Sequence, residues 1–279
     1  MSDSTFSTPL DRTRWSGVIR HARLWRACLG MALVRESHFR ANMLAIVVVG
    51  LVQVVIAIIP VLLLFSYTES VSGWSQAGVI VLLGVHQVLM SLLAMFVAPN
   101  LTRMTEYVTH GDLDLLLIRP VNTQWFVTTR WIQPAQAFNV ATGVLLVAIG
   151  LWRSAESPGM IDAGQGLVVF LAGFVLVTCA WATMSFLVFW LSAVVQLTWF
   201  VHDVMGAARY PVTFFPAVLR AILTFVVPLA FATTFPAQAL TGGISWWVVS
   251  GAVVFAVAAV VLVRLLWVYA VRFYASASS

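Results

Sequence analysis

The sequence contains no lysine, and all fifteen of its basic residues are arginine. A phosphate-binding loop of the Walker type requires a lysine between its last glycine and a serine or threonine. No such loop can form in this chain, so the sequence provides no P-loop ATPase site of its own.

Charged residues are also scarce: they occupy 9% of the 279 positions, while hydrophobic residues occupy 61%. Because a soluble globular domain carries roughly 25% charged residues, this composition excludes that class and indicates an all-α polytopic membrane protein. Cys28 and Cys179 lie in an arginine-rich segment and in an apolar run, so neither a disulfide framework nor a cysteine metal site is indicated.

The five histidines are scattered among different segments, and the sequence offers no Ser-His-Asp arrangement. Asp112 and Asp114 are close enough in sequence to bind a divalent cation together, but we favour a surface that faces water or another protein. We therefore predict no catalytic residue, no metal site and no cofactor in this chain, and no nucleic-acid partner.

The first forty residues are polar and rich in arginine, so we expect no cleavable signal peptide. Within them, apolar side chains recur at helical spacing at positions 18, 22, 25, 29 and 33, and arginines 20, 23 and 35 project to the other side. This pattern predicts an amphipathic elbow helix that lies along the membrane surface. A basic cytoplasmic segment without fixed structure is the alternative.

Hydropathy alone places five apolar runs, each close to or above the roughly 20 residues that cross the hydrocarbon core. They cover residues 43–65, 78–97, 135–151, 166–201 and 246–263. Tryptophans 74, 152, 246 and 247 fall at the expected ends of spans, as interfacial residues do. With one more span before the last run, the chain divides into a cytoplasmic N-terminal segment (1–42), a six-helix membrane domain (43–271) and a cytoplasmic tail (272–279).

The arginines predict the orientation, because an excess of basic residues in short flanking loops marks the cytoplasmic side. Seven arginines precede the first span, three lie between the second and third spans and two follow the last span, whereas the loop after the third span holds only Arg153. Both termini are therefore expected in the cytoplasm, and the predicted location is the bacterial cytoplasmic (inner) membrane.

Residues 110–130, between the second and third spans, form the segment best suited to contact another protein. A short amphipathic helix is predicted just before it, with its apolar side formed by Leu101, Met104, Tyr107 and Val108. Gly111 follows where a helix commonly ends in a left-handed turn. Two aspartates and an apolar quartet then lead to Arg119 and Pro120, where the proline disfavours a helical Arg119.

The letters GDLDLLLIRPVN in this segment resemble the cytoplasmic motif of ABC-2 type permeases, the membrane subunits of ATP-driven exporters. Asp112 stands where that family usually has glutamate, and Thr123 stands where it often has a second proline. The stretch ARYPVTFFPAVLRAILTFVVPLAFATTFPAQALTGG and the tail RFYASASS extend the resemblance to most of the chain.

The resemblance implies partners as well as a fold. In this family two permeases pair, here expected to be related but different chains, and each docks on an ABC ATPase subunit that binds ATP and Mg. By this resemblance, the segment around the motif is a cytoplasmic coupling helix that transmits ATPase closure. The coupling residues that it implies are Arg103, Glu106, Gly111, Asp112, Asp114, Arg119 and Pro120.

Hydropathy and the resemblance disagree about the fifth span. Hydropathy places it at residues 221–239 and leaves 196–220 as a cytoplasmic loop. The family pattern implies a fifth helix at 193–210, followed by an outer re-entrant hairpin at 211–243, a segment that contains four prolines. The distribution of arginines slightly favours the first arrangement, and both give six spans.

Ionisable groups are rare in the predicted spans, and such groups often mark an ion or substrate path because burying them in a membrane is costly. His86 is the main one, and Gln87 and Met90 lie near it, where a methionine can adapt to apolar or aromatic substrates. The expected substrate path consists of His86, Gln87, Met90, Trp199 and Asp203. Ordinary packing or lipid contact is the alternative for these residues.

The resemblance therefore implies the permease subunit of an ABC exporter, which forms the membrane path for a small amphiphilic or toxic compound, as in drug efflux. An ion-coupled secondary transporter is one alternative, although the hydropathy arrangement leaves its spans without a carboxylate. An accessory membrane subunit that only scaffolds a complex is another.

Overall fold

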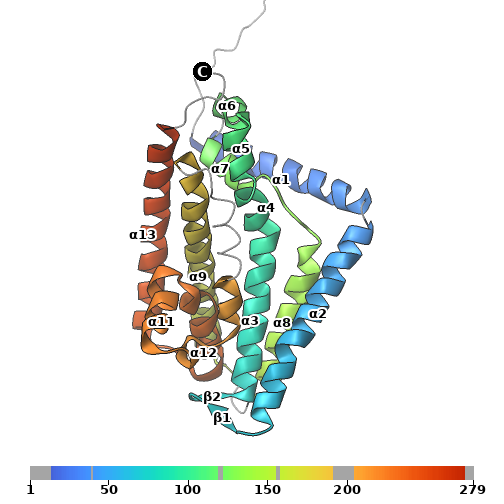
Figure 1. Ribbon diagram of the computed structural model, residues 1–279, viewed down its shortest axis with the longest axis vertical. Helices are drawn as coiled ribbons and strands as arrows, with labels where there is room; N and C mark the ends of the chain where they lie inside the picture. The colour runs from blue at the N-terminus through green and yellow to red at the C-terminus, as the bar shows by residue number, and fades with distance from the viewer. Residues whose placement is uncertain (1–13, 39, 119–121, 155–157, 191–203, 274–279) are drawn as a thin grey trace, which may run out of the picture.

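The computed structural model describes residues 14–38, 40–118, 122–154, 158–190 and 204–273. In this part of the chain most residues are helical, and the only strands are the short β1 (Ser70–Val71) and β2 (Trp74–Ser75), which pair as a hairpin. Figure 1 shows long helices running side by side, with α1 (Arg14–His38) lying across one end. We call the end that carries α1 the arginine-rich end, and we call the end that carries β1 and β2 the hairpin end.

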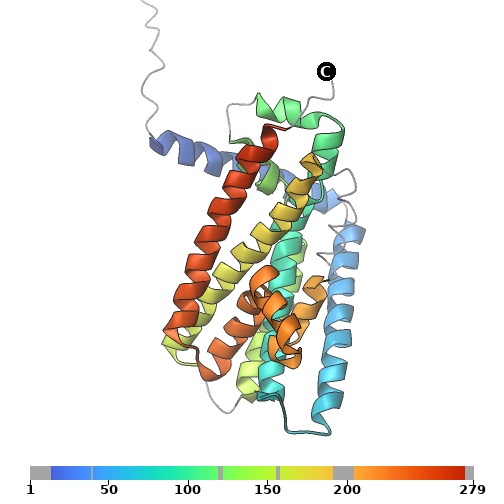
Figure 2. The ribbon, with the colours of Figure 1, turned by 60° about the vertical axis from the view of Figure 1, so that its left-hand side comes forward.

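Five helical segments of the described residues are long and apolar enough to cross a membrane. They are α2 (Arg40–Phe65), the run from α3 (Gln76–Leu92) to α5 (Met104–Thr109), α8 (Gln136–Arg153), the run that begins with α9 (Met160–Phe186), and α13 (Trp246–Val271). All five overlap the apolar runs that hydropathy places, so the predicted fold class is confirmed. Figure 2 shows α13 alongside α9, with α2 at the opposite side of the bundle.

The segment after residue 216 is not a straight span. Two helical pieces, Ala217–Val226 and Ala230–Gly242, are bent by 80° at a short break that contains Pro228. The second piece ends in α12 (Phe235–Gly242). Residues 221–239, where hydropathy places a crossing segment, therefore do not form one straight helix.

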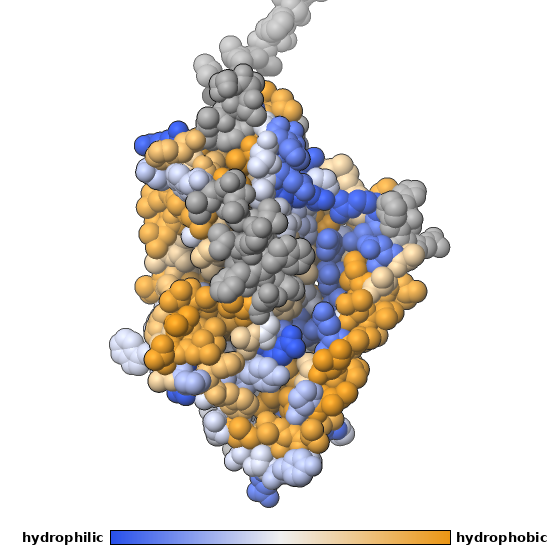
Figure 3. Space-filling model, viewed as in Figure 1, coloured by the Kyte–Doolittle hydropathy of each residue, from blue (hydrophilic) through white to orange (hydrophobic). Residues whose placement is uncertain are grey.

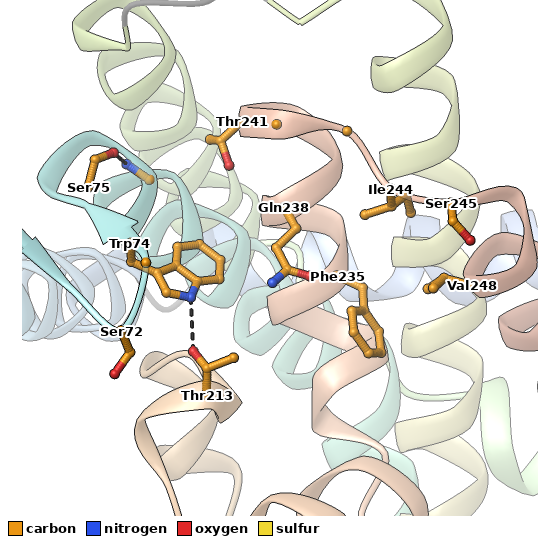
Figure 4. A pocket seen from close by; sticks show the side chains of 14 residues that line it. Ser72, Trp74, Ser75, Thr213, Phe235, Gln238, Thr241, Ile244, Ser245 and Val248 are labelled. Atoms are coloured by element: carbon orange, nitrogen blue, oxygen red, sulfur yellow. Dashed lines mark hydrogen bonds between the residues drawn. The ribbon is translucent and has the colours of Figure 1, made fainter.

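Both ends of this bent segment lie at the hairpin end. Thr213 before it and Gly243 after it line the same pocket, together with Trp74 of β2. The Trp74 indole Nε1 donates a hydrogen bond to Thr213 Oγ1 at 3.0 Å (Figure 4). The chain enters and leaves at one end, which supports the re-entrant hairpin over a cytoplasmic loop at 196–220. Residues 193–203 of the expected fifth helix lie outside the described residues.

The contact with Thr213 also corrects the expectation for Trp74. Its side chain is only 6% exposed and belongs to a buried cluster with residues of α2, α3 and α12, so it is not a lipid-facing interfacial residue. Trp152 and Trp247, by contrast, are 85% and 87% exposed at helix ends. The sequence position of a tryptophan at a span end does not distinguish these two cases.

Glycines allow α3 and α8 to pack with their backbones in close contact. A Cβ added at Gly84 would stand 2.6 Å from the backbone nitrogen of Val147, and one at Gly143 would stand 2.8 Å from that of Val88. Small residues permit this approach between membrane helices, where dispersion contacts replace the hydrophobic effect as the source of association. α3 and α8 therefore pack as one closely joined pair.

We predict that Gly173→Ala destabilises the protein while Gly164→Ala, in the same helix α9, does not. A Cβ at Gly173 would stand 2.5 Å from the backbone nitrogen of Ala232 in the re-entrant hairpin, whereas a Cβ at Gly164 has nothing within 4 Å. The backbone shift should cost roughly 1–3 kcal/mol, although alanine is the better helix former. Thermal unfolding of both variants in detergent measures the difference, and equal midpoints would contradict the packing.

Candidate functional site

Two short helices form the tip of the arginine-rich end: α5 and α6 (Asp112–Leu117) (Figure 1). Gly111 joins them with φ of 78°, the left-handed conformation that glycine adopts without a steric penalty. The predicted left-handed turn at Gly111 is therefore confirmed. We call residues 104–118 the knuckle.

The knuckle is held in place by its apolar side. Met104 and Tyr107 of α5 and Leu113 and Leu116 of α6 are buried in the same cluster as Leu101. The predicted amphipathic helix is thus confirmed at these positions. On the outer side of α6, three apolar side chains remain 61%, 37% and 80% exposed: Leu115, Leu117 and Ile118. Of the apolar quartet before Arg119, only Leu116 is buried, and the other three side chains stay exposed.

The residues implied to couple to an ATPase do not all share one surface. Glu106 and Asp112 are exposed on the knuckle, and Asp114 is half-buried there. Arg103 is half-buried, and its guanidinium lies 4.0 Å above the ring of Trp131. The acidic residues therefore lie on adjacent knuckle helices, while Arg103 faces the chain that leads to α8. Arg119 and Pro120 lie outside the described residues.

A clamp between Asn100 and Trp131, which the sequence pattern does not reveal, anchors the base of the knuckle. Asn100 is buried in α4 (Ala98–Leu101); its Oδ1 accepts from the Trp131 N–H at 2.7 Å and its Nδ2 donates to the Trp131 carbonyl at 2.8 Å. The Trp131 indole Nε1 donates to the Tyr107 hydroxyl at 2.9 Å. The available sequence signal was one asparagine at the end of an apolar run.

Three guanidinium groups from separate elements surround Trp131. Arg103, Arg130 and Arg35 lie 4.0, 4.9 and 5.4 Å from the centre of its ring. Arg35 of α1 also donates from Nη2 to the Ile132 carbonyl at 2.9 Å. A cavity of about 400 Å³, which we call the arginine cavity, opens beside them and is lined by Arg35, Glu36, Asn42, Ile46, Pro99, Arg103, Trp131 and Gln133.

Three residues of the expected substrate path lie together within the bundle. His86, Gln87 and Met90 of α3 line one cavity of about 270 Å³, the central cavity, with Gln53 of α2 and Arg209. His86 Nε2 lies 3.2 Å from the Met205 carbonyl oxygen. Gln53 and Arg209 were not predicted, because nothing in their local sequence shows that they meet α3. Trp199 and Asp203 lie outside the described residues.

The central cavity continues toward the arginine-rich end. A second cavity of about 340 Å³, the α2 groove, shares Gln53, Gln87 and Met90 with the central cavity and Ile46 with the arginine cavity. Figure 3 shows hydrophilic surface in the hollow beside the hydrophobic face of α2. A row of cavities therefore follows α2 from the arginine cavity into the bundle.

A separate pocket of about 530 Å³ lies at the hairpin end, between β2, the re-entrant hairpin and the start of α13. Figure 4 shows Gln238 and Phe235 of α12 on one side of it and Trp74 on the other. The described residues that line this pocket carry no charge. No group of three histidine, cysteine or acidic side chains suited to a metal ion occurs within the described ranges.

Membrane-crossing helices, a structured knuckle at one end and a row of partly polar cavities along α2 define a polytopic membrane protein of the permease class. A model of the family described as ABC-2 family transporter protein matches residues 51–278. The chain therefore belongs to this family, which supplies the membrane component of ABC-type transporters and implies an ABC ATPase partner. No curated protein and no solved structure matches it significantly.

We predict that Asn100→Ala loosens the base of the knuckle. The Trp131 N–H and carbonyl would lose their partners, and each unsatisfied buried group costs about 1–3 kcal/mol. The free energy of unfolding should fall by about 2 kcal/mol or more, and limited proteolysis should cut faster within residues 110–130. Thr102→Ala, which removes an exposed hydroxyl bonded to Ala98 of its own helix, is the control. Identical behaviour of both variants would exclude a structural role for the clamp.

Proposed function

We propose that the chain is the permease subunit of an ABC exporter and forms the membrane path for a small amphiphilic or toxic compound. The observation that carries this proposal is the continuous helical run Gln76–Thr109, which reaches from the hairpin end to the knuckle. His86, Gln87 and Met90 lie on the same run and line the central cavity. A displacement of the knuckle would therefore move one wall of the cavity.

The proposed site for the ATPase is the outer side of the knuckle. Leu115 and Ile118 form an exposed apolar centre, and Glu106 and Asp112 add exposed charges on the same two helices. An apolar centre with a polar rim is the usual composition of a protein interface. ATP and Mg would bind on the partner, because this chain has no lysine to complete a Walker loop.

The central cavity suits an amphiphilic substrate. Gln53 and Gln87 offer amide donors and acceptors, and Ile56 and Met90 offer apolar contact. Its volume of about 270 Å³ is near the lower end of ligand pockets, which span roughly 300–1,000 Å³. The adjoining α2 groove adds about 340 Å³. Together they provide room for a compound with a polar head and an apolar body.

We further propose that a second permease, a related but different chain, packs on the side of α2. Only 11% of an apolar 18-residue stretch of α2 is buried within this chain. The corresponding share is 61% for the run that contains α3. A second subunit on this side would close the α2 groove and place the central cavity near a subunit interface. Export as the direction of transport rests on the resemblance to exporters.

Affinity purification of the tagged chain, expressed with its chromosomal neighbours and followed by an ATPase assay, tests the proposal. We expect a P-loop ATPase and a second permease to co-purify, and ATP hydrolysis to drive export from inverted vesicles. Transport driven by an ion gradient without an ATPase would establish the secondary transporter instead. A stable complex in which removal of this chain leaves transport intact would establish the accessory scaffold.

We predict that the double variant Leu115→Asp and Ile118→Asp lowers recovery of the ATPase by at least about tenfold, because it places two charges in the apolar centre of the interface. Both side chains are mostly exposed, so the fold should be retained. Tyr67→Asp, at a residue 84% exposed near the hairpin end, is the control. Asp114→Ala should uncouple ATP hydrolysis from transport. Full recovery and full transport in these variants would remove the knuckle from the docking surface.

We predict that Gln87→Leu and Gln53→Leu each raise the KM for a transported amphiphile by about fivefold to tenfold, since the polar head loses one hydrogen bond of roughly 1 kcal/mol or more. Val55→Leu, at an exposed position of α2 that lines neither the central cavity nor the α2 groove, provides the matched control. The measurement is the initial rate of transport against substrate concentration. A KM that moves equally in the control would show that the cavity does not select the substrate.

A further inference from the structure

The arginine cavity concentrates positive charge at one place. Arg35 and Arg103 both line it, and the Arg130 guanidinium lies 4.9 Å from the centre of the Trp131 indole ring, which also lines it. Glu36 is the one carboxylate among the described lining residues. Burial raises the pKa of Glu36, while the Ala135 backbone and the charge of Arg35 act in the opposite direction. An anion in the cavity would offset the mutual repulsion of the guanidinium groups.

The donors in the cavity suit a phosphate group. A guanidinium group offers paired N–H donors whose geometry matches phosphate oxygens, and such charge-assisted hydrogen bonds are stronger than neutral ones. Asn42 and Gln133 add carboxamide donors on the same lining. The volume of about 400 Å³ leaves space for more than the phosphate alone.

The cavity lies where the chain enters the membrane. Asn42 and Ile46 are in the first turns of α2, at the start of its apolar run, and Pro99 and Arg103 lie where the α3 run approaches the knuckle. Ile46 also lines the α2 groove, which continues past Val49 with mostly apolar surface. The polar arginine cavity therefore opens onto the mostly apolar α2 groove. A lipid has the same arrangement, with a polar headgroup followed by an apolar acyl chain.

We propose that the arginine cavity binds the phosphate of an anionic membrane phospholipid, with Arg35 and Arg103 on its oxygens and an acyl chain along α2 from Ile46 toward Val49. Basic pockets between membrane helices on the cytoplasmic side bind acidic headgroups in this way. The bound phosphate would tie α1 to the end of the second span. The phosphate site lies outside the central cavity and the docking surface on the knuckle, whereas the acyl chain would enter the α2 groove that adjoins the central cavity.

Native mass spectrometry of the full-length chain in detergent, with added phosphatidylglycerol or phosphatidylcholine, tests the proposal. We expect phosphatidylglycerol to bind at least about tenfold more tightly, and the double variant Arg35→Gln and Arg103→Gln to abolish this preference. Arg153→Gln, which removes an arginine at the hairpin end, should keep it. Equal binding of the two lipids by the unmodified chain would overturn the proposal.

Glu36→Gln provides a second readout that leaves both arginines in place. Because it removes the opposing carboxylate, it should tighten phosphatidylglycerol binding severalfold, and unchanged or weaker binding would contradict the site. Inorganic phosphate at millimolar concentration should compete poorly; competition as strong as that of the lipid would assign the cavity to a soluble anion. Arginine variants that retain the lipid preference but lose the ATPase would assign the cavity to protein docking instead.

Discussion

The hydrogen bonds between the Asn100 carboxamide and the Trp131 backbone fix the geometry of the arginine-rich end. Next to them, Pro99 has no N–H to donate to the Met95 carbonyl four residues earlier, and that carbonyl accepts from the Gln133 N–H at 3.0 Å. Buried backbone groups need hydrogen-bond partners within the protein. The two contacts supply them, and they bind the chain that leads into α8 to the end of the α3 run.

The position of Trp131 then determines what surrounds it. Its ring contacts guanidinium groups from α1, from the turn before α5 and from the end of α7 (Thr123–Thr129). Its indole Nε1–H donates a hydrogen bond to the Tyr107 hydroxyl within the knuckle. Helix α1, the knuckle and the chain that leads into α8 therefore meet at one side chain. A displacement of the knuckle would therefore be transmitted to α1 through the contacts of Trp131, as well as along α3.

The sequence allows the spans to be predicted, because the thickness of the bilayer imposes a minimum apolar length. It also predicts the left-handed turn at Gly111, because glycine adopts that conformation without a steric penalty. Helical periodicity predicts that Met104 and Tyr107 lie on the buried face of a helix. The bend near Pro228 could not be decided, because hydropathy averages over the break and the deciding contact joins Trp74 to the distant Thr213. The contacts of Arg35 and Arg103 with Trp131 could not be predicted either, because these residues are far apart in the sequence.

The packing of α2 links these features to transport. A Cβ at Gly50 would overlap the carboxamide of Asn139 in α8, so α2 crosses α8 closely at that point, while much of its remaining surface is exposed. The buried Asn139 Oδ1 has no hydrogen-bond partner among the described residues, and Gln53 and Gln87 line cavities on the same side. Polar groups in a membrane interior are costly unless they are hydrogen-bonded. Water, a substrate or a second subunit on this side of the bundle would supply the hydrogen bonds that these groups lack within the chain.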